Sequence, residues 1–201
     1  MITLYDLPLS GHAHRVRLLL SILNLPYTKV TVNMIEGEHK TESFLKLNPL
    51  GQVPVLKDDD LVLRDSTAML VYLATKYDGH RCWLPEAPKL AAQIQQWLAT
   101  SVKELVLGPA VARSANVFGR EVNYEEAVER SCRLLSSLYE PHLEVNSWLV
   151  GEHATIADLA NYSYIAVADE GGLDMQSYPN IRAWLSRVEA LEGFEAMPRA
   201  M

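Results

Sequence analysis

The chain has 201 residues, of which 49% are hydrophobic and 21% are charged, so it is long enough and apolar enough to fold around a substantial core. Its formal net charge of −7 argues against nucleic acid or an anionic membrane as the main partner, because both favour an excess of Lys and Arg. The sequence has no run of about 18 apolar residues, and its first residues lack the basic start of a secretory signal, so it predicts a globular protein that neither spans a membrane nor is secreted.

The first part of the chain predicts alternating strands and helices. Short β-branched or alternating segments indicate strands, and longer apolar segments with helical periodicity indicate helices. The expected strands are residues 2–6, 28–32, 53–56 and 61–63, and the expected helices are residues 14–24, 42–46 and 66–77. The order β-α-β followed by β-β-α predicts a thioredoxin-like α/β domain over residues 1–77.

Beyond a linker rich in Pro and Gly, every segment predicts a helix, so residues 88–201 are expected to form an all-helical domain. The expected helices are residues 89–106, 124–145, a segment that starts at Thr155, and residues 180–190. Gly108 and Pro109 predict a kink or break at the end of the first of these helices. Thr155 and Asp158 have the spacing of a capping box.

Two groups of residues have both a chemical and a structural interpretation. Asp58, Asp59 and Asp60 could be part of a metal site, but ligands from other segments are missing, so a solvated hairpin turn is the preferred interpretation. Cys82 and Cys132 could form a disulfide or supply a catalytic thiol. We expect instead two small buried side chains, because neither cysteine lies near the segment on which the function depends.

That function is indicated by three motifs. Residues 10–16 read SGHAHRV, residues 48–54 read NPLGQVP after a GEHK segment, and Asp65-Ser66 opens the helix at 66–77. In combination these motifs resemble the soluble glutathione transferases, most closely the serine-type phi and theta classes. The resemblance implies a thioredoxin-like domain followed by an all-helical domain, glutathione as co-substrate, no metal, a homodimer and a cytoplasmic location.

Ser10 is the expected catalytic residue. It precedes a helix, where free N–H groups and the helix dipole favour negative charge, and its hydroxyl could donate a hydrogen bond to the glutathione thiolate. The alternative is an ordinary helix cap.

His12 and His14 depart from the phi pattern. His12 could donate to the thiolate or act as a base, the pair could bind a metal, or both could be helix-start residues that only tune the site.

The glutathione-binding set is expected to come from the two later motifs. The resemblance implies a cis bond between Val53 and Pro54, with the Val53 backbone pairing with the cysteinyl part of glutathione. Ser66 suits the γ-glutamyl carboxylate because it lies at a helix N-terminus, and Asp65 suits the ammonium group. The other expected contacts are Gln52 to the γ-glutamyl end and His39 and Lys40 to the glycyl carboxylate. For Asp65-Ser66 the alternative is capping alone, and for His39-Lys40 it is a solvated loop.

The second substrate is poorly specified by sequence. The resemblance implies an electrophile pocket with an apolar wall and one cation, formed by Leu9, Val106, Pro109, Ala110 and Arg113. The favoured activity is conjugation of glutathione to small hydrophobic electrophiles in detoxification, or reduction of peroxides. A glutathione-dependent isomerase or dehalogenase and a non-catalytic glutathione-binding or stress-response protein are the alternatives. The dimer contact is expected near Met69 and Tyr72.

Overall fold

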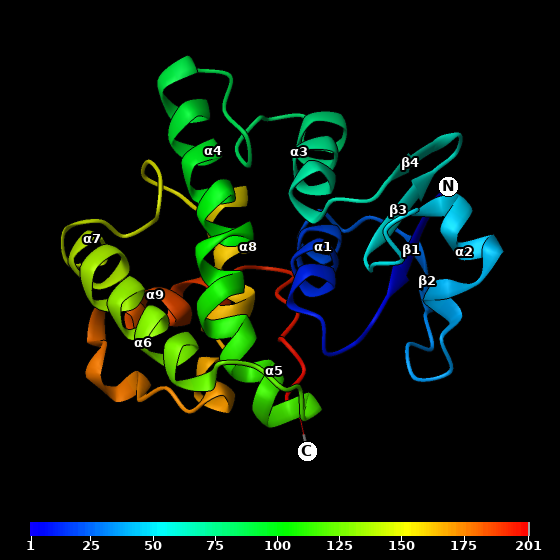
Figure 1. Ribbon diagram of the computed structural model, residues 1–201. Helices are drawn as coiled ribbons and strands as arrows, with labels where there is room; N and C mark the ends of the chain where they lie inside the picture. The colour runs from blue at the N-terminus through cyan, green and yellow to red at the C-terminus, as the bar shows by residue number, and fades with distance from the viewer. Residues whose placement is uncertain (201) are drawn as a thin grey trace.

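A computed structural model describes residues 1–200, and its first part is a mixed four-stranded sheet with helices on both faces (Figure 1). The elements are β1 (Ile2–Asp6), α1 (Gly11–Ile22), β2 (Tyr27–Thr31), α2 (Glu42–Leu47), β3 (Val55–Asp58), β4 (Leu61–Leu63) and α3 (Ser66–Tyr77). The strand order is β2-β1-β3-β4, with β1 parallel to β2 and antiparallel to β3. This arrangement confirms the thioredoxin-like fold.

The two faces of the sheet are covered differently. Leu4 and Leu56 of the sheet belong to the main core together with α1 and α3, which separate the sheet from the rest of the molecule. On the opposite face, Phe44 of α2 packs with Val32 and Val55 in a smaller cluster. The side-chain alternation of β1 explains this division, because successive residues of a strand point to opposite faces.

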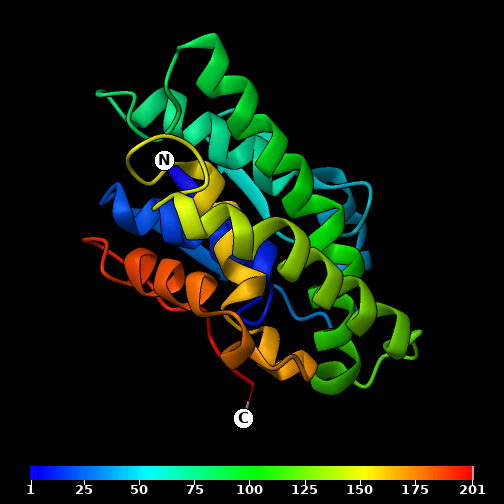
Figure 2. The ribbon, with the colours of Figure 1, turned by 90° about the vertical axis from the view of Figure 1, so that its left-hand side faces the viewer.

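The remainder of the described chain is helical, as the sequence predicts. Its helices are α4 (Pro88–Val102), α5 (Val111–Phe118), α6 (Tyr124–Leu134), α7 (Glu140–Val145), α8 (Ile156–Ile165) and α9 (Pro179–Glu189). Helix α8 is buried along its whole length, and Figures 1 and 2 show it at the centre of this part, surrounded by the other helices. The domain boundaries at residues 77 and 88 stay a prediction.

Pro109 does not end the helical path. Residues Val106–Ala110 form a π-helical turn with Pro109 inside it, and α5 follows directly. A π-helical turn absorbs the missing N–H of proline without reversing the chain. A second π-helical turn at Leu135–Tyr139 joins α6 to α7, so the helix expected over 124–145 is continuous but not regular.

The capping box at the start of α8 is confirmed. Oδ2 of Asp158 accepts the N–H of Thr155 at 2.9 Å, and the Thr155 hydroxyl accepts the N–H of Ala157 at 3.2 Å. Oδ1 of the same buried aspartate accepts the N–H of Leu149 at 2.9 Å and Nε1–H of Trp184 at 3.0 Å. Asp158 therefore ties the start of α8 both to the preceding loop and to α9.

Three of the expectations from the sequence are wrong. Cys82 and Cys132 are both exposed, because they lie in the linker and on the outer face of α6. Asp59 and Asp60 form the expected exposed turn, but Asp58 does not belong to it: it is buried at the end of β3, and it accepts hydrogen bonds from the Tyr72 hydroxyl at 2.8 Å and from Lys76 at 2.7 Å. Met69 lies in the core and cannot contribute to a dimer contact.

The C-terminal tail, residues 191–200, runs back from α9 along α1 (Figure 1). The Glu195 carboxylate pairs with Nε of Arg17 at 3.0 Å, and the Glu195 carbonyl lies 2.8 Å from Nε2 of the buried His14. Arg17 also forms a buried ion pair with Asp6. The tail therefore fixes α1 between the sheet and the helical part.

In the described residues, no helix is long and apolar enough to cross a membrane.

Candidate active site

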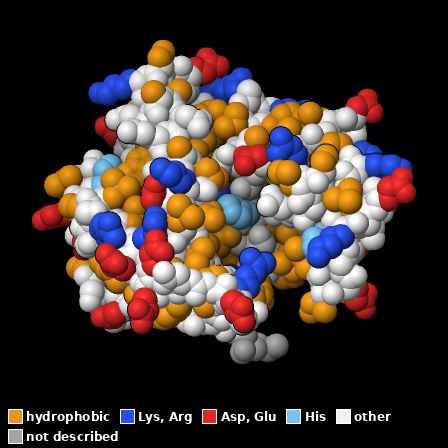
Figure 3. All heavy atoms as spheres, in the orientation of Figure 1, with side chains coloured by type: hydrophobic (Ala, Val, Ile, Leu, Met, Phe, Trp, Pro, Cys, Tyr) orange, Lys and Arg blue, Asp and Glu red, His pale blue; other side chains and the backbone are white. Residues whose placement is uncertain are grey.

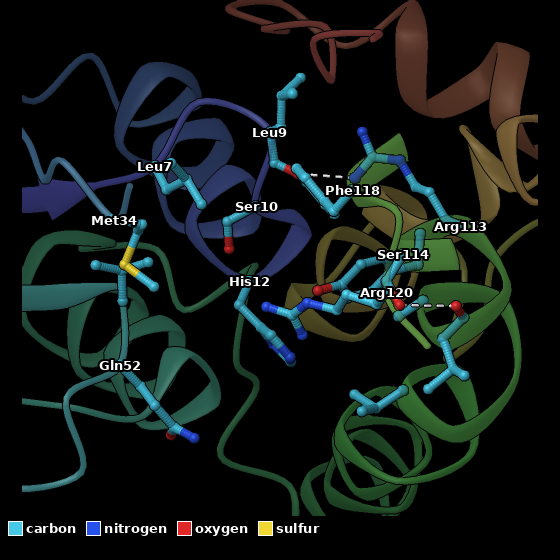
Figure 4. A pocket seen from close by; sticks show the side chains of 15 residues that line it. Leu7, Leu9, Ser10, His12, Met34, Gln52, Arg113, Ser114, Phe118 and Arg120 are labelled. Carbon is cyan, nitrogen blue, oxygen red and sulfur yellow. Dashed lines mark hydrogen bonds between the residues drawn. The ribbon is translucent and has the colours of Figure 1, made fainter. Parts of the chain in front are cut away.

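A cavity of about 360 Å³ opens between the sheet domain and the helical part, at the N-terminus of α1. Figure 3 shows the hollow between the two parts, with hydrophobic side chains along its walls. The side chains that line it come from the loop before α1, from the segments around Met34 and Gln52, and from α5 and α8 (Figure 4). The lining residues are Leu7, Leu9, Ser10, His12, Met34, Gln52, Val53, Val106, Ala110, Val111, Arg113, Ser114, Phe118, Arg120 and Tyr164.

Ser10 is the N-cap of α1, and its side chain points into the cavity (Figure 4). Its Oγ accepts the N–H of Ala13 at 3.3 Å, which satisfies one of the free donors of the helix. A hydroxyl that accepts in this way still has its own proton to donate. The N–H groups at the start of the helix and the helix dipole add positive potential at the same place.

The loop that carries Ser10 is held from both parts of the molecule. Arg17 of α1 donates to the carbonyl of Pro8 at 3.0 Å, and Arg113 of α5 donates to the carbonyl of Leu9 at 2.7 Å. Arg113 is buried and paired with Glu170 at 2.6 Å. The cation expected in the electrophile pocket is therefore a clamp on the Ser10 loop, with its charge already neutralised.

A chain of polar groups leads from the interior to the cavity through Ser66. Nη1 of Arg15 donates to the Ser66 Oγ at 3.5 Å, and the same Oγ lies 3.3 Å from Nδ1 of His12. Because arginine only donates, the Ser66 proton is available for Nδ1 of His12, which leaves the His12 Nε2–H as a donor. Burial lowers the pKa of His12 to about 3, and the nearby charge of Arg15 adds to this effect. His12 is therefore neutral at physiological pH.

Arg15 is fully buried and has no carboxylate partner among the described residues. Its guanidinium donates to the Ser101 hydroxyl at 3.2 Å and to the Ser101 carbonyl at 3.4 Å, while Nε has no hydrogen-bond partner in this part of the chain. Burial lowers the pKa of Arg15 to about 10, so the side chain stays charged at neutral pH. A buried, uncompensated cation directly behind Ser66 favours an anion bound at Ser66.

Asp65 is the N-cap of α3. Its Oδ1 accepts the N–H groups of Thr67 and Ala68, both at 2.9 Å, and the Thr67 hydroxyl at 2.6 Å. Burial raises the pKa of the Asp65 carboxyl, but these hydrogen bonds outweigh it and hold the pKa below its ordinary value. Oδ2 makes no hydrogen bond to any described residue, so the side chain caps the helix with one oxygen and presents the other to a cation.

The segment around the second motif forms the opposite rim of the cavity. The Val53–Pro54 bond is cis, and the backbone of Val53 makes no hydrogen bond within residues 1–200. His39 lies beside Gly51, where a Cβ would come within 3.0 Å of the His39 carbonyl oxygen, and Gly51 has a left-handed φ of 59°. Glycine is therefore required at this turn, which packs against the His39 backbone. Lys40 is exposed.

The expected electrophile wall is found in part. Leu9, Val106 and Ala110 line the cavity, whereas Pro109 is buried in the π-helical turn and is not among the lining residues. The sequence interpretation missed six lining residues: Met34, Val111, Ser114, Phe118, Arg120 and Tyr164. Tyr164 of α8 lies against Gly11 so closely that a Cβ there would be 2.7 Å from its ring. The glycine after Ser10 was the available signal, because it permits this approach.

The comparisons with known proteins agree with this geometry. Residues 9–76 match the family model "Glutathione S-transferase, N-terminal domain", and residues 95–192 match "Glutathione S-transferase, C-terminal domain". A glutathione S-transferase 1 from Manduca sexta is 32% identical over 200 residues, covering 97% of this chain and 91% of that protein. The chain belongs to the glutathione S-transferase family.

Other relatives and solved structures support this membership. A glutathione S-transferase theta-2 from Mus musculus is 31% identical, covering 88% of this chain and 75% of that protein. A crystal structure of a glutathione S-transferase from Pseudomonas fluorescens has a TM-score of 0.91 at 35% identity and covers 98% of this chain and 99% of its own. The human glutathione S-transferase T1-1 structure has a TM-score of 0.83 at 28% identity, covering 95% of this chain and 84% of its own. The chain is a transferase of this family.

Proposed function

We propose that the enzyme is a serine-type glutathione transferase, in which the Ser10 hydroxyl stabilises the thiolate of bound glutathione for attack on a small electrophile. The observation that carries this proposal is the position of Ser10 at the N-terminus of α1, with its side chain directed into the cavity. Attack by the thiolate forms a sulfur–carbon bond while the leaving group departs with its electron pair.

The free energies of these interactions are sufficient to ionise the thiol of bound glutathione at neutral pH. A free thiol has a pKa near 8.5, so only roughly 3% is ionised at pH 7. A hydrogen bond from a hydroxyl to the thiolate contributes about 1.5 to 3 kcal/mol, and the helix dipole adds about 0.3 to 1 kcal/mol. At 1.36 kcal/mol per pKa unit, these contributions lower the pKa of the thiol by about 1.5 to 3 units. No histidine–aspartate pair is needed.

The binding of glutathione is proposed to follow the expected set. The γ-glutamyl carboxylate binds at Ser66 in front of the buried charge of Arg15, and the ammonium group binds the free oxygen of Asp65. Gln52 contacts the same end of the ligand, the backbone of Val53 before Pro54 pairs with the cysteinyl part, and the glycyl carboxylate lies towards His39 and Lys40. A buried cation without a partner supports the first of these contacts, because ligand binding compensates its charge.

His12 is proposed to assist by hydrogen bonding and not as a base. Its pKa of about 3 leaves the imidazole neutral, and the Ser66 contact at 3.3 Å favours a proton on Nε2. A neutral N–H donor in the cavity adds a second hydrogen bond to the thiolate or to the γ-glutamyl end. His14 is buried against Ser163 and the tail, so its role is structural.

The biological setting is proposed from the family. We infer a cytoplasmic enzyme of detoxification that acts as a homodimer. An apolar groove between β4, α3 and α4 supports the dimer, since it is lined by Leu61, Leu63, Ala68, Val71 and Leu98. An apolar surface of this kind is typical of a subunit interface. Tyr72 lies at the same groove, whereas Met69 does not.

The test is the ultraviolet absorbance of the thiolate as a function of pH, with glutathione bound to the wild type and to Ser10→Ala. The loss of one charge-assisted hydrogen bond should raise the pKa of bound glutathione by about 1 to 2 units. Conjugation at pH 6.5 should fall about 10- to 100-fold and recover in part at high pH, while glutathione affinity barely changes.

Two further variants serve as controls. Ser114→Ala removes another hydroxyl from the cavity, one that already donates to the Val111 carbonyl at 2.8 Å, and should leave the titration in place. His12→Ala should have an effect of only a few-fold. If Ser10→Ala leaves the titration unchanged while His12→Ala moves it, the serine assignment is wrong.

A further inference from the structure

Arg120 is a cation in the cavity that neither the glutathione contacts nor the Ser10 loop uses. It follows Gly119, which ends α5 in the left-handed conformation at φ 62°. This turn directs the chain back over the cavity, and Figure 4 shows the Arg120 side chain reaching into the space near His12 and Ser114. Within residues 1–200, the Arg120 guanidinium makes no ion pair and no hydrogen bond.

The charges around Arg120 leave it uncompensated. None of the described side chains that line the cavity is an aspartate or a glutamate. Arg113 is neutralised by Glu170, whose second carboxylate oxygen accepts the N–H of Ala200 at 2.8 Å. Both carboxylate oxygens of Glu170 therefore already have partners, and Glu170 does not compensate the charge of Arg120. In a chain with a net charge of −7, a cavity with an excess of positive charge attracts anions locally.

Neither carboxylate of glutathione is assigned to Arg120. Its γ-glutamyl carboxylate is assigned to Ser66 and Arg15, and its glycyl carboxylate is assigned to the rim at His39 and Lys40. Arg120 directly follows α5 and its Gly119 cap, and α5 supplies the electrophile side of the cavity. The negative charge that Arg120 would bind must therefore come from the second substrate.

We infer that the enzyme prefers electrophiles that carry a carboxylate on an apolar body, with the carboxylate bound by Arg120. The inference rests on the proposed function. Leu9, Val106 and Phe118 provide apolar surface for the body of such a molecule. The planar guanidinium of Arg120 can bind a carboxylate through two parallel hydrogen bonds, which holds the reacting carbon towards Ser10.

The experiment compares two probes that differ in charge only at one end, 4-chloro-3-nitrobenzoate and 4-chloro-3-nitrobenzamide. In both, the thiolate forms a bond to the ring carbon and chloride leaves. Rates are divided by the uncatalysed rate in buffer, which removes the difference in intrinsic reactivity. We expect Arg120→Gln to raise the KM for the benzoate by about five- to twenty-fold, the usual size of a lost charge-assisted pair. The KM values for the benzamide and for glutathione should stay within about two-fold.

Two controls sharpen the comparison. Arg120→Lys keeps the charge and should retain much of the preference, although it loses the paired hydrogen bonds. Arg133→Gln removes an exposed arginine of α6 outside the cavity and should change neither probe. The preference for the benzoate should also weaken as salt is added, since Arg120 is exposed.

Two results would overturn the inference. One is an equal KM for both probes in the wild type after correction for reactivity. The other is an Arg120→Gln variant with a raised KM for glutathione with both probes, which would place Arg120 in the glutathione site.

Calorimetry with the glutathione conjugates of both probes separates this inference from the proposed function. Tighter binding of the benzoate conjugate, lost in Arg120→Gln, supports the inference even where turnover is slow. Equal binding of the two conjugates refutes the inference alone. If neither conjugate nor glutathione binds, the proposed function fails and the inference fails with it.

Discussion

At the scale of single residues, the site uses side chains that also hold the fold. Asp65 caps α3 through Oδ1, and Ser10 caps α1 through Oγ. The Ser10 side chain points into the cavity, and the second carboxylate oxygen of Asp65 makes no hydrogen bond to any described residue. A helix N-terminus is suited to this double use, because its free N–H groups fix the capping side chain and add positive potential.

The double role of Asp65 calls for a substitution that separates its two functions. Asp65→Asn keeps an oxygen for the cap but removes the charge that we propose binds the γ-glutamyl ammonium. We expect the affinity for glutathione to fall by about 2 to 4 kcal/mol, because the ammonium is left unpaired in a partly desolvated site. Calorimetry measures the affinity, and the midpoint of thermal unfolding should barely move.

Two comparisons test this explanation. Asp174→Asn makes the same change at another cap, whose carboxylate accepts the Gln176 N–H at 3.0 Å, and should leave affinity intact. Lys40→Ala should cost only about 0 to 1 kcal/mol, since Lys40 is exposed. An unchanged affinity in Asp65→Asn would remove the Asp65 charge from the binding site.

The sequence predicts the residues of the site that belong to local motifs and misses those that come from elsewhere in the chain. Ser10, Asp65 and Ser66 could be identified because they belong to motifs that together resemble those of the family, although by position alone each would be interpreted as part of a helix cap. Arg120 and Tyr164 could not, because their place in the cavity depends on how the helical part packs against α1. The same holds for Asp58, whose partners on α3 bury a residue that looks like part of a polar turn.

At the scale of the elements, α1 carries two histidines that differ in their surroundings. His12 faces the cavity, whereas His14 lies between Ser163 of α8 and the tail, with Nδ1 2.9 Å from the Ser163 hydroxyl. Burial lowers the pKa of His14 to about 4, the charges of Arg17 and Arg15 act in the same direction, and the Glu195 carbonyl opposes them. The folded protein therefore holds His14 in its neutral form at physiological pH.

This arrangement predicts a loss of stability in mild acid. His14 takes up a proton near pH 6.5 when the chain is unfolded but only near pH 4 when it is folded. Its contribution is therefore complete above pH 6.5 and is lost as the pH falls towards 4, by on the order of 3 kcal/mol. Urea unfolding at several pH values measures this free energy.

His14→Gln should reduce the slope of unfolding free energy against pH in this window, even if it lowers stability at every pH. His153→Gln changes an exposed histidine and should leave the slope as it is. An unchanged slope in His14→Gln would mean that other groups cause the acid sensitivity.

At the scale of the whole molecule, the sequence predicts both folds but not the contacts between them. The alternation of strands and helices follows from periodicity, and the capping box of α8 follows from spacing. The hydrogen bond from Arg113 to the Leu9 carbonyl joins residues that lie far apart in the chain, and no local sequence pattern predicts it. The π-helical turn at Pro109 is likewise a response to packing, where the sequence predicted a kink or break.

The assembly provides a prediction at this scale. A homodimer through the groove of β4, α3 and α4 should bury at least roughly 1,000 Å². Val71→Arg places a charge in this groove and should convert the dimer to a monomer in sedimentation experiments at micromolar concentration. Val145→Arg, at a side chain that is 80% exposed on α7, should leave the dimer intact. A wild-type monomer under these conditions would contradict the proposed assembly.

The contacts of the tail also bear on the order in which the molecule is completed during synthesis. Arg17 and His14 leave the ribosome well before Ser163 and Glu195, which they contact. Domains usually fold as they emerge, N-terminal domain first. Here the helix that presents Ser10 acquires these partners only after Glu195 has emerged. A polypeptide that stopped just short of Glu195 would contain every helix and strand of the described residues and still lack the contacts that hold the helix presenting Ser10.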